Sequence, residues 1–313
     1  MTILVTGSAG FIGHAVCLAL LERGEKVIGV DLDERRPEAV ERHALVYSHP
    51  NFLFYREDVS VPEIVDNLVA VHEVDGIVHC AGKAGVRCPE GEAMDYGTNN
   101  LLTMIAVLEA CRKHDIRLTY ASSSSVYDSD EQRPHRETDP RRPGSLYAVT
   151  KASAEMMAQI YADVHGVRSV GLRFFSVYGP RGRPDMAPLI FAHKLMHKET
   201  ISIFGWCRRD FTYIDDIVDG VMAVLDSDLR GHELFNLGAG RPTDIAEFGQ
   251  MLSMSLLGSP TDMTRTAARS EEMRWTWANN DKAKRMLGWE PKVGLDVGIQ
   301  RLADWYRGSI CSR

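Results

Sequence analysis

The sequence predicts an α/β protein: a doubly wound parallel sheet with a smaller C-terminal lobe. Two observations carry this prediction. The first half of the chain alternates short β-branched runs with longer helical patterns, and a glycine-rich turn separates the first strand from the first helix. Helices between strands form βαβ units, so the sheet is parallel and covered on both faces. We expect its strands at residues 3–6, 26–30, 52–55, 76–79, 117–121, 169–173 and 233–237, with a first helix at 11–23.

The regular alternation breaks after Arg173. A turn-rich segment at residues 179–184 reads as a loop, and the chain beyond residue 240 is more polar. A chain of 313 residues also exceeds a typical single domain. We therefore expect a large domain from residues 1–173 plus about 211–238, and a lobe from about 174–210 and 239–313. Within the lobe we expect a helix at 188–198, a strand at 201–204 and a last helix at 295–306.

Composition excludes several classes of protein. The net charge of −7 argues against nucleic acid as the main partner. The six cysteines are scattered without a CxxC pair, which favours reduced thiols and predicts no metal site. No signal-peptide pattern and no apolar run of about 20 residues is present. We expect a soluble cytoplasmic protein that does not bind a membrane.

A glycine motif follows the first predicted strand. Gly7, Gly10 and Gly13 form a GxxGxxG pattern that opens the first helix. Glycine allows the tight turn and lets a pyrophosphate approach the backbone at a helix N-terminus. A plain turn is the alternative, but the strand–turn–helix context favours a Rossmann-type dinucleotide site that includes Phe11 and Ile12.

Acidic residues at strand ends indicate which dinucleotide binds. Asp31 ends the second strand, where a carboxylate accepts the ribose hydroxyls and repels the 2′-phosphate of NADP. This favours NAD, although Arg35 and Arg36 nearby could weaken the preference. Asp58 and Val59 are placed to contact the adenine, but an exposed loop aspartate is nearly as good an interpretation.

A tyrosine and a lysine form the candidate catalytic pair. Tyr147 and Lys151 are four apart in a helical pattern and so share one face. A tyrosine with a pKa of about 10 is a poor base, but a lysine ammonium and a nicotinamide cation stabilise its phenolate. Ser123, in the serine run 122–125, could hydrogen-bond the reacting oxygen. YxxxK pairs also occur by chance, and a serine run can be a polar loop; the glycine motif upstream favours catalysis.

With these motifs the chain resembles the extended short-chain dehydrogenase/reductase family from Met1 to about residue 305. Further marks are the segments 79–82, 126–127 and 209–211, together with Asn99. The resemblance implies NAD contacts from Ala81, Gly82, Lys83, Asn99, Tyr147 and Lys151.

A closer likeness is carried by the segments 84–87, 120–127, 145–148, 172–180, 182–186 and 209–216. On these segments the chain is most similar, within this family, to UDP-glucuronate 4-epimerases. The likeness implies that Tyr147 takes the proton of the sugar 4-hydroxyl while C4 gives a hydride to NAD⁺. The 4-keto sugar turns over and the hydride returns to its other face, which interconverts UDP-glucuronate and UDP-galacturonate without net redox change.

The substrate's carboxylate adds a further requirement. A glucuronyl 4-ketone is a β-keto acid, which loses CO₂ readily unless the carboxylate is held out of alignment. Ser124 and Ser125, with Arg183, could hold it in the family's arrangement. Related decarboxylases place a glutamate at the position of Ser125, and dehydratases an Asp-Glu pair at 124–125. Neither carboxylate is present, which favours epimerisation.

The remaining substrate contacts follow from the same resemblance. Arg209 and Arg269 match positions that grip the diphosphate, which suits planar guanidinium groups. Both could instead be surface arginines, the more so for Arg269, where Glu271-Glu272 replaces the usual Gly-Asp. Arg87 and Ser176 are further candidates, although Arg87 could equally have a role on the loop surface.

Three alternative functions stay open: a 4-epimerase for UDP-glucose or UDP-N-acetylglucosamine, a UDP-glucuronate decarboxylase, and an NAD-binding protein without turnover. Departures at Asp128, Arg181 and the turn 205–208 bear on which sugar is taken. Helices at about 99–112 and 148–164 are apolar on more than one face, so we expect a homodimer formed through them.

Overall fold

A computed structural model describes residues 1–32, 37–128, 130–267 and 273–311, with side chains described up to residue 309. Its centre is a seven-stranded parallel sheet in the order β10-β6-β5-β4-β1-β2-β3. The order reverses between β1 and β4, which is where such sheets bind ligands. The fold class expected from the sequence is confirmed. The strands are β1 Thr2–Thr6, β2 Lys26–Asp31, β3 Phe52–Arg56, β4 Gly76–His79, β5 Arg117–Ser123, β6 Ser169–Phe174 and β10 His232–Leu237.

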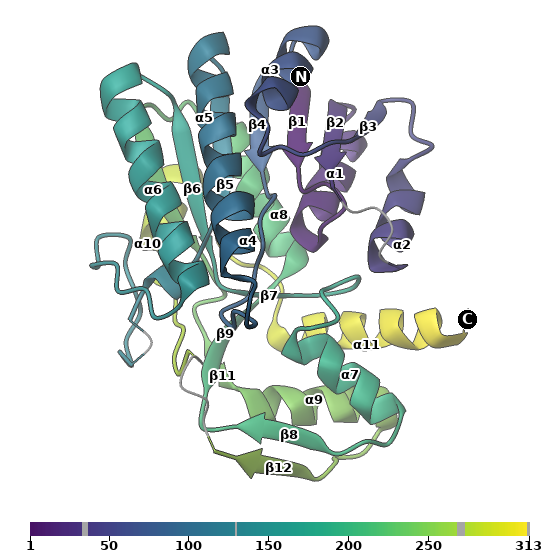
Figure 1. Cartoon of the computed structure of the whole chain (residues 1–313). Coiled ribbons are helices and arrows are strands. Elements are labelled where there is room, and N and C mark those ends of the chain that lie inside the picture. The colour runs from purple at the N-terminus through teal and green to yellow at the C-terminus, as the bar shows by residue number, and fades with distance from the viewer. Residues whose placement is uncertain (33–36, 129, 268–272, 312–313) are drawn as a thin grey trace.

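Helices cover both faces of this sheet (Figure 1). Strand β1 shows why both faces are apolar: Ile3 and Val5 pack into one core and Leu4 into the other. In the described chain, no helix has the length and apolar character that crossing a bilayer needs. One face carries α1 Phe11–Glu22, α2 Pro37–Val46 and α8 Ile214–Leu225; the other carries α3 Pro62–His72, α5 Thr103–His114 and α6 Leu146–His165.

A second group of elements packs beyond the carboxyl ends of the large sheet, at the bottom of Figure 1. It contains a small sheet, β11-β9-β7, and a parallel pair, β12-β8. Several of these strands are short or polar, and the sequence did not predict β7, β9, β11 or β12. Because these elements form a group separate from the large sheet, we propose the division into a domain of residues 1–173 plus about 211–238 and a lobe of about 174–210 and 239–313. The elements are β7 Ser176–Tyr178, β8 Ile201–Phe204, β9 Arg208–Tyr213, β11 Pro242–Asp244, β12 Met263–Thr266, α7 Ala187–Met196, α9 Ile245–Leu257 and α11 Leu295–Cys311, with α10 Asp281–Leu287 beside β10.

Candidate active site

The glycine loop forms a site for an anion at the start of α1. Gly7 has a φ of +69°, and a Cβ there would lie 2.6 Å from the backbone nitrogen of Ala81. A Cβ on Gly13 would lie 2.1 Å from the carbonyl oxygen of Gly7. Helix α1 begins after Gly10 with no side-chain cap and no acidic residue in its first turn. Its first N–H groups therefore suit a diphosphate, and the loop fits NAD.

The acidic residues at the ends of β2 and β3 lie at this same edge of the sheet. The Asp31 carboxylate accepts a hydrogen bond from the backbone nitrogen of Ala9, at 3.0 Å. Asp58 closes a turn by accepting from the backbone nitrogen of Ser60 at 2.8 Å, and Val59 is buried. Asp31 is thus joined directly to the glycine loop. Arg35 and Arg36 lie outside the described residues.

Asn100, which the sequence analysis missed, holds the loop after β4. Its Oδ1 accepts from the backbone nitrogen of Lys83 at 2.7 Å, and its Nδ2 donates to the oxygen of Lys83 at 3.1 Å and to Thr150 Oγ1 at 2.8 Å. A Cβ on Gly82 would lie 2.9 Å from Asn100 Oδ1 and 3.7 Å from Lys151 Nζ. The loop backbone is thereby fixed beside the lysine.

The neighbouring Asn99 points elsewhere. Its amide donates to the backbone oxygen of Asp95 at 2.8 Å. The expected helix at 99–112 is in fact α4 Ala93–Gly97, a π-helical turn η1 Thr98–Leu102, and α5. The π-turn shifts the helical register, which turns the second asparagine inward. We propose Asn100, rather than Asn99, as the asparagine of the cofactor site. The side chain of Lys83 pairs with Glu92 and Asp95.

Tyr147 and Lys151 lie on the first turns of α6. Lys151 is buried, donates to the carbonyl oxygen of Ala121 at 2.8 Å, and has its Nζ 5.9 Å from the centre of the Tyr147 ring. Burial, together with the charge of Lys151, lowers the pKa of His79 to about 3. His79 is therefore neutral, and the lysine provides the positive charge near the tyrosine.

The serine run turns at the end of β5 and is buried throughout. Ser123 Oγ accepts from the backbone nitrogen of Ser125 at 3.1 Å and from Ser125 Oγ at 2.9 Å. The 3₁₀ turn η2 Ser124–Val126 creates this arrangement. Because Ser123 accepts both bonds, its own O–H remains a donor that can serve a substrate oxygen.

A buried ionic network anchors α6 under this strand. Glu155 accepts from Ser122 Oγ at 2.6 Å, from Arg141 at 2.6 Å and from Arg173 at 2.8 and 2.7 Å. Burial opposes its ionisation, yet the hydrogen bonds and charge of Arg173 hold the pKa of Glu155 below its ordinary value. Local residue spacing did not predict this pair. A charged residue inside the apolar strand β6 was the available signal, because buried charges need partners.

The candidate substrate residues approach from other elements. Arg183 donates to the carbonyl oxygen of Ala84 at 3.1 Å and to Asp185 at 2.6 Å. Burial opposes its charge, but the hydrogen bond and charge of Asp185 raise the pKa of Arg183. Arg183 is therefore held on the loop after β4, the same loop whose Gly82 lies beside Lys151.

The other proposed substrate contacts are more widely spread. Arg87 is exposed, with its guanidinium carbon 5.9 Å from the ring centre of Phe204 in β8. Arg209 is half-buried in β9 and Ser176 half-buried in β7. Arg269 lies outside the described residues. The two half-buried residues come from adjacent strands of one sheet.

The departures noted in the sequence take defined places. Arg181 has a φ of +58°, unusual for a residue with a side chain. Trp206 is 75% exposed, and the guanidinium of Arg265 lies 3.7 Å from its ring centre. Asp128 accepts from Arg142 at 3.2 Å.

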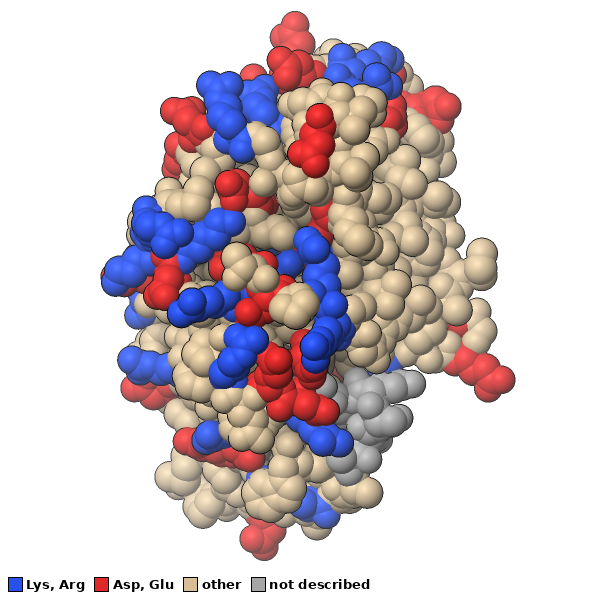
Figure 2. All heavy atoms as spheres, turned by 90° about the vertical axis from the view of Figure 1, so that its left-hand side faces the viewer, with Lys and Arg blue, Asp and Glu red and all other residues tan. Residues whose placement is uncertain are grey.

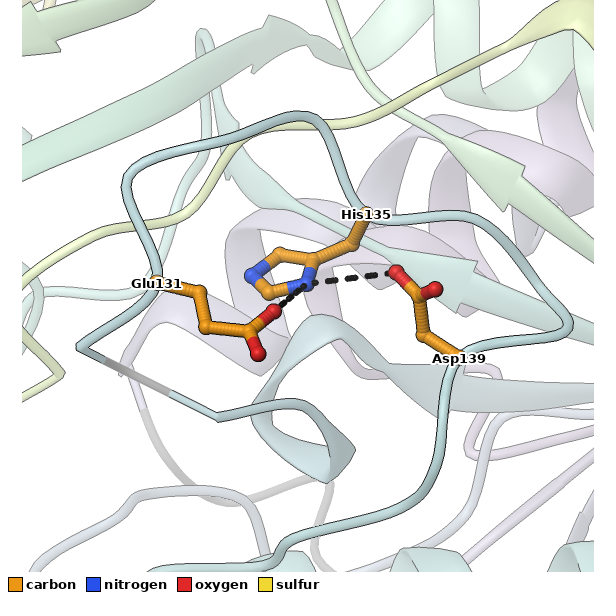
Figure 3. Close-up of side chains that lie close together, drawn as sticks. All are labelled: Glu131, His135 and Asp139. Atoms are coloured by element: carbon orange, nitrogen blue, oxygen red, sulfur yellow. Dashed lines mark ion pairs between the residues drawn. The ribbon is translucent and has the colours of Figure 1, made fainter.

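One cluster of described residues has the composition of a cation site: Glu131, His135 and Asp139 (Figure 3). The guanidinium of Arg133 lies 2.7 Å from Glu131 and 2.8 Å from Asp139. The His135 ring stacks on Tyr127, with centres 4.6 Å apart. Since Arg133 already supplies a positive charge to both carboxylates, we assign no metal here.

The sheet, the glycine loop and the Tyr147–Lys151 pair define a protein of the short-chain dehydrogenase/reductase type. The chain belongs to the NAD dependent epimerase/dehydratase family, whose model matches residues 3–238.

Among its relatives is UDP-glucuronate 4-epimerase 4 of Arabidopsis thaliana, 34% identical over 98% of this chain and 75% of the relative. The UDP-glucuronic acid 4-epimerase of Bacillus cereus, solved with UDP-glucuronic acid and NAD, superposes with a TM-score of 0.90 and 32% identity. The alignment covers 99% of this chain and 100% of that one. The UDP-glucose 4-epimerase of Thermotoga maritima, solved with UDP-glucose, gives a TM-score of 0.90 at 29% identity over 99% and 100% of the two chains.

Proposed function

We propose that this protein is an isomerase that interconverts UDP-glucuronate and UDP-galacturonate with NAD as its cofactor. One observation carries the proposal. The Tyr147–Lys151 pair lies at the end of a buried serine strand that has no carboxylate at positions 124 and 125, and Arg183 is held on the loop after β4 beside this strand. The uronate-specific relatives named above support the choice of sugar.

Proton transfer at the sugar's 4-oxygen falls to Tyr147. The phenolate accepts the 4-hydroxyl proton, with the Lys151 ammonium 5.9 Å from the ring centre. Ser123 donates to the same oxygen. Bound NAD would supply a reversible hydride acceptor for C4. Gly7, Gly10, Phe11, Ile12 and Gly13 would hold its diphosphate, and Asp31 would hold its ribose.

Retention of the carboxylate separates this reaction from decarboxylation. Ser124 and Ser125 offer neutral hydroxyls in a buried turn. The guanidinium of Arg183 donates to Asp185 at 2.6 Å. The substrate's carboxylate would replace Asp185 as its hydrogen-bond acceptor. We propose that these groups hold the carboxylate so that its C–C bond is poorly aligned with the ketone.

A 4-epimerase for UDP-glucose is the second candidate, since a relative solved with UDP-glucose has the same fold. The test is incubation of the protein with UDP-glucuronate and with UDP-glucose, without added NAD, followed by chromatography. UDP-galacturonate as the main product supports our proposal. Conversion of UDP-glucose alone would replace it with the second candidate, and UDP-pentose with CO₂ would indicate a decarboxylase.

A tyrosine variant tests the catalytic assignment. Tyr147→Phe should lower turnover at least about 1,000-fold, as loss of a general base does, and leave bound NAD in place. Tyr161→Phe, on the same helix with its hydroxyl on Glu109, is the matched control. Undiminished turnover in Tyr147→Phe would refute the assignment.

The protein would act as a homodimer in the cytoplasm. Helices α5 and α6 expose apolar side chains, and Figure 2 shows a broad surface without charged residues. Surfaces of this kind commonly mark protein interfaces. The five cysteines with described side chains are free thiols, which suits a reducing compartment. The exposed residues include Ile105, Val149, Met156, Ile160 and Val164.

A further inference from the structure

A buried arginine on α2, Arg42, lies between the glycine loop and the loop that carries Arg183. It is 3% exposed. Its Nη1 donates to the carbonyl oxygen of Ala9 at 3.0 Å. Its Nε and Nη2 donate to the oxygen of Arg181 at 3.0 and 2.8 Å, and Nη2 also reaches the oxygen of Gly182 at 3.0 Å. One planar guanidinium group thus joins two loops that are far apart in the sequence.

The first of these loops is the proposed cofactor site. Ala9 lies between Gly7 and Gly10, and both of its backbone polar groups are held by side chains. Its N–H donates to Asp31 at 3.0 Å and its carbonyl accepts from Arg42. Arg42 therefore helps to fix the peptide over which the dinucleotide would lie.

The second loop is the proposed carboxylate site. Arg181 has a left-handed backbone, and Gly182 donates to the oxygen of Gly179 at 3.3 Å. On its other side the segment reaches Ala84 through Arg183 at 3.1 Å. Residues 181–183 are therefore fixed by hydrogen bonds to Arg42 on one side and to Ala84, in the loop after β4, on the other. Loss of either set of contacts would move Arg183.

We infer that Arg42 is a positioning residue for recognition of the sugar's carboxylate. It fixes the segment that presents Arg183 at a set distance from the cofactor loop. The inference rests on the proposed function, because it assigns Arg183 to a uronate. A ligand that lacks the sugar acid, such as UDP, should not depend on Arg42.

The test compares two ligands on the NAD-loaded protein. Arg42→Lys keeps the charge, but an ammonium group cannot reproduce a planar fork to both loops. We expect the KM for UDP-glucuronate and its calorimetric Kd to rise about tenfold, the effect of losing one good polar contact. The inhibition constant and Kd of UDP should stay within about twofold, bound NAD should be retained, and the UDP-pentose fraction of the product should rise. Arg23→Lys, an arginine paired with Asp226 on the surface, is the control and should change neither ligand.

Each outcome decides the inference. A selective loss of UDP-glucuronate over UDP supports it, and Arg42→Met should enlarge that loss if the variant folds. Equal losses of affinity for both ligands with a lower Tm would mean that Arg42 only supports the fold. Unchanged affinity for UDP-glucuronate would mean that Arg42 has no role in recognition of the carboxylate. Either result overturns the inference. If the wild type does not convert UDP-glucuronate, the proposed function fails separately. The ratio of the two Kd values in Arg42→Lys still decides the inference.

Discussion

Helices α1 and α6 both begin at the edge of the sheet that carries the site, yet their first turns differ. Helix α1 follows Gly10 and has no side-chain cap. Helix α6 follows Ser145, whose Oγ accepts from the backbone nitrogen of Ala148 at 3.2 Å. An uncapped helix start leaves N–H groups for an anionic ligand, whereas a capped one is complete by itself. The proposed cofactor site is thus formed mainly by backbone groups, and the proposed catalytic site by anchored side chains.

The packing beneath the two helices differs in the same way. Helix α1 packs on the sheet through apolar residues such as Val16 and Leu20, and Gly13 lets it approach the backbone of Gly7 closely. Helix α6 is seated by the Glu155–Arg173 pair, with Arg173 1% and Glu155 0% exposed. A buried pair is costly to break on one side only, because the remaining charge loses its compensation.

Breaking that pair should have the largest effect. Arg173→Met should lower the free energy of unfolding by about 3–5 kcal/mol, since Glu155 would stay buried with its main partner removed. Urea denaturation measures this. The double variant Arg173→Met/Glu155→Leu should recover at least half of the loss. Equal instability of the single and double variants would show that the pair does not act as a unit.

A methyl group in the glycine loop should disrupt the proposed cofactor site at the start of α1. Gly13→Ala would place its Cβ 2.1 Å from the oxygen of Gly7, so the loop backbone must move. We expect NAD affinity to fall at least about 100-fold, together with a lower Tm, because the clash strains the loop in the absence of cofactor as well. Calorimetric titration with NAD measures this. Gly308→Ala, where a Cβ meets nothing within 4 Å, is the control; normal NAD binding in Gly13→Ala would contradict the loop assignment.

A buried histidine makes the α1 side sensitive to acid. Burial, with the charges of Arg42, Arg181 and His43, lowers the pKa of His14 to about 3. In the unfolded chain His14 therefore binds a proton as the pH falls below about 6.5, whereas in the folded chain it stays neutral. The stability from neutral His14 is complete above that pH and falls by about 1.4 kcal/mol per pH unit below it.

The variant His14→Leu should remove the part of the acid-induced loss of stability that comes from His14. Its loss of unfolding free energy between pH 6.5 and 5.5 should be about 1 kcal/mol smaller than that of the wild type. Replacement of His165, exposed at the end of α6, is the control. Identical pH profiles for His14→Leu and wild type would contradict a neutral buried His14.

The helix cap should have the smallest effect. Ser145→Ala removes the acceptor for the Ala148 N–H and should lower stability by about 1 kcal/mol. Turnover should change little if the buried network holds α6 in place. Thermal unfolding and kcat are the readouts; a large loss of kcat with unchanged Tm would mean that the cap, rather than the network, orients Tyr147.

The comparison also explains what the sequence could reveal. The glycine loop, the large sheet and the YxxxK pair depend on residues close together in the chain, so local spacing predicted them. Arg42 and Glu155 depend on partners brought together only by folding, from Arg181 and Arg173 respectively. Asn100 was missed for another reason: the π-turn at 98–102 alters a register that a regular helix would set. The polar strands of the lobe lack the apolar pattern on which strand prediction depends.

The fate of the hydrogen on C4 tests the central claim most directly. UDP-glucuronate carrying deuterium at C4 is incubated with the purified protein without added NAD, and the product is examined by NMR and mass spectrometry. We predict UDP-galacturonate that keeps its deuterium at C4, because the hydride leaves and returns within one site. Epimerised product with the deuterium exchanged for solvent hydrogen would contradict an oxidation and re-reduction at that carbon.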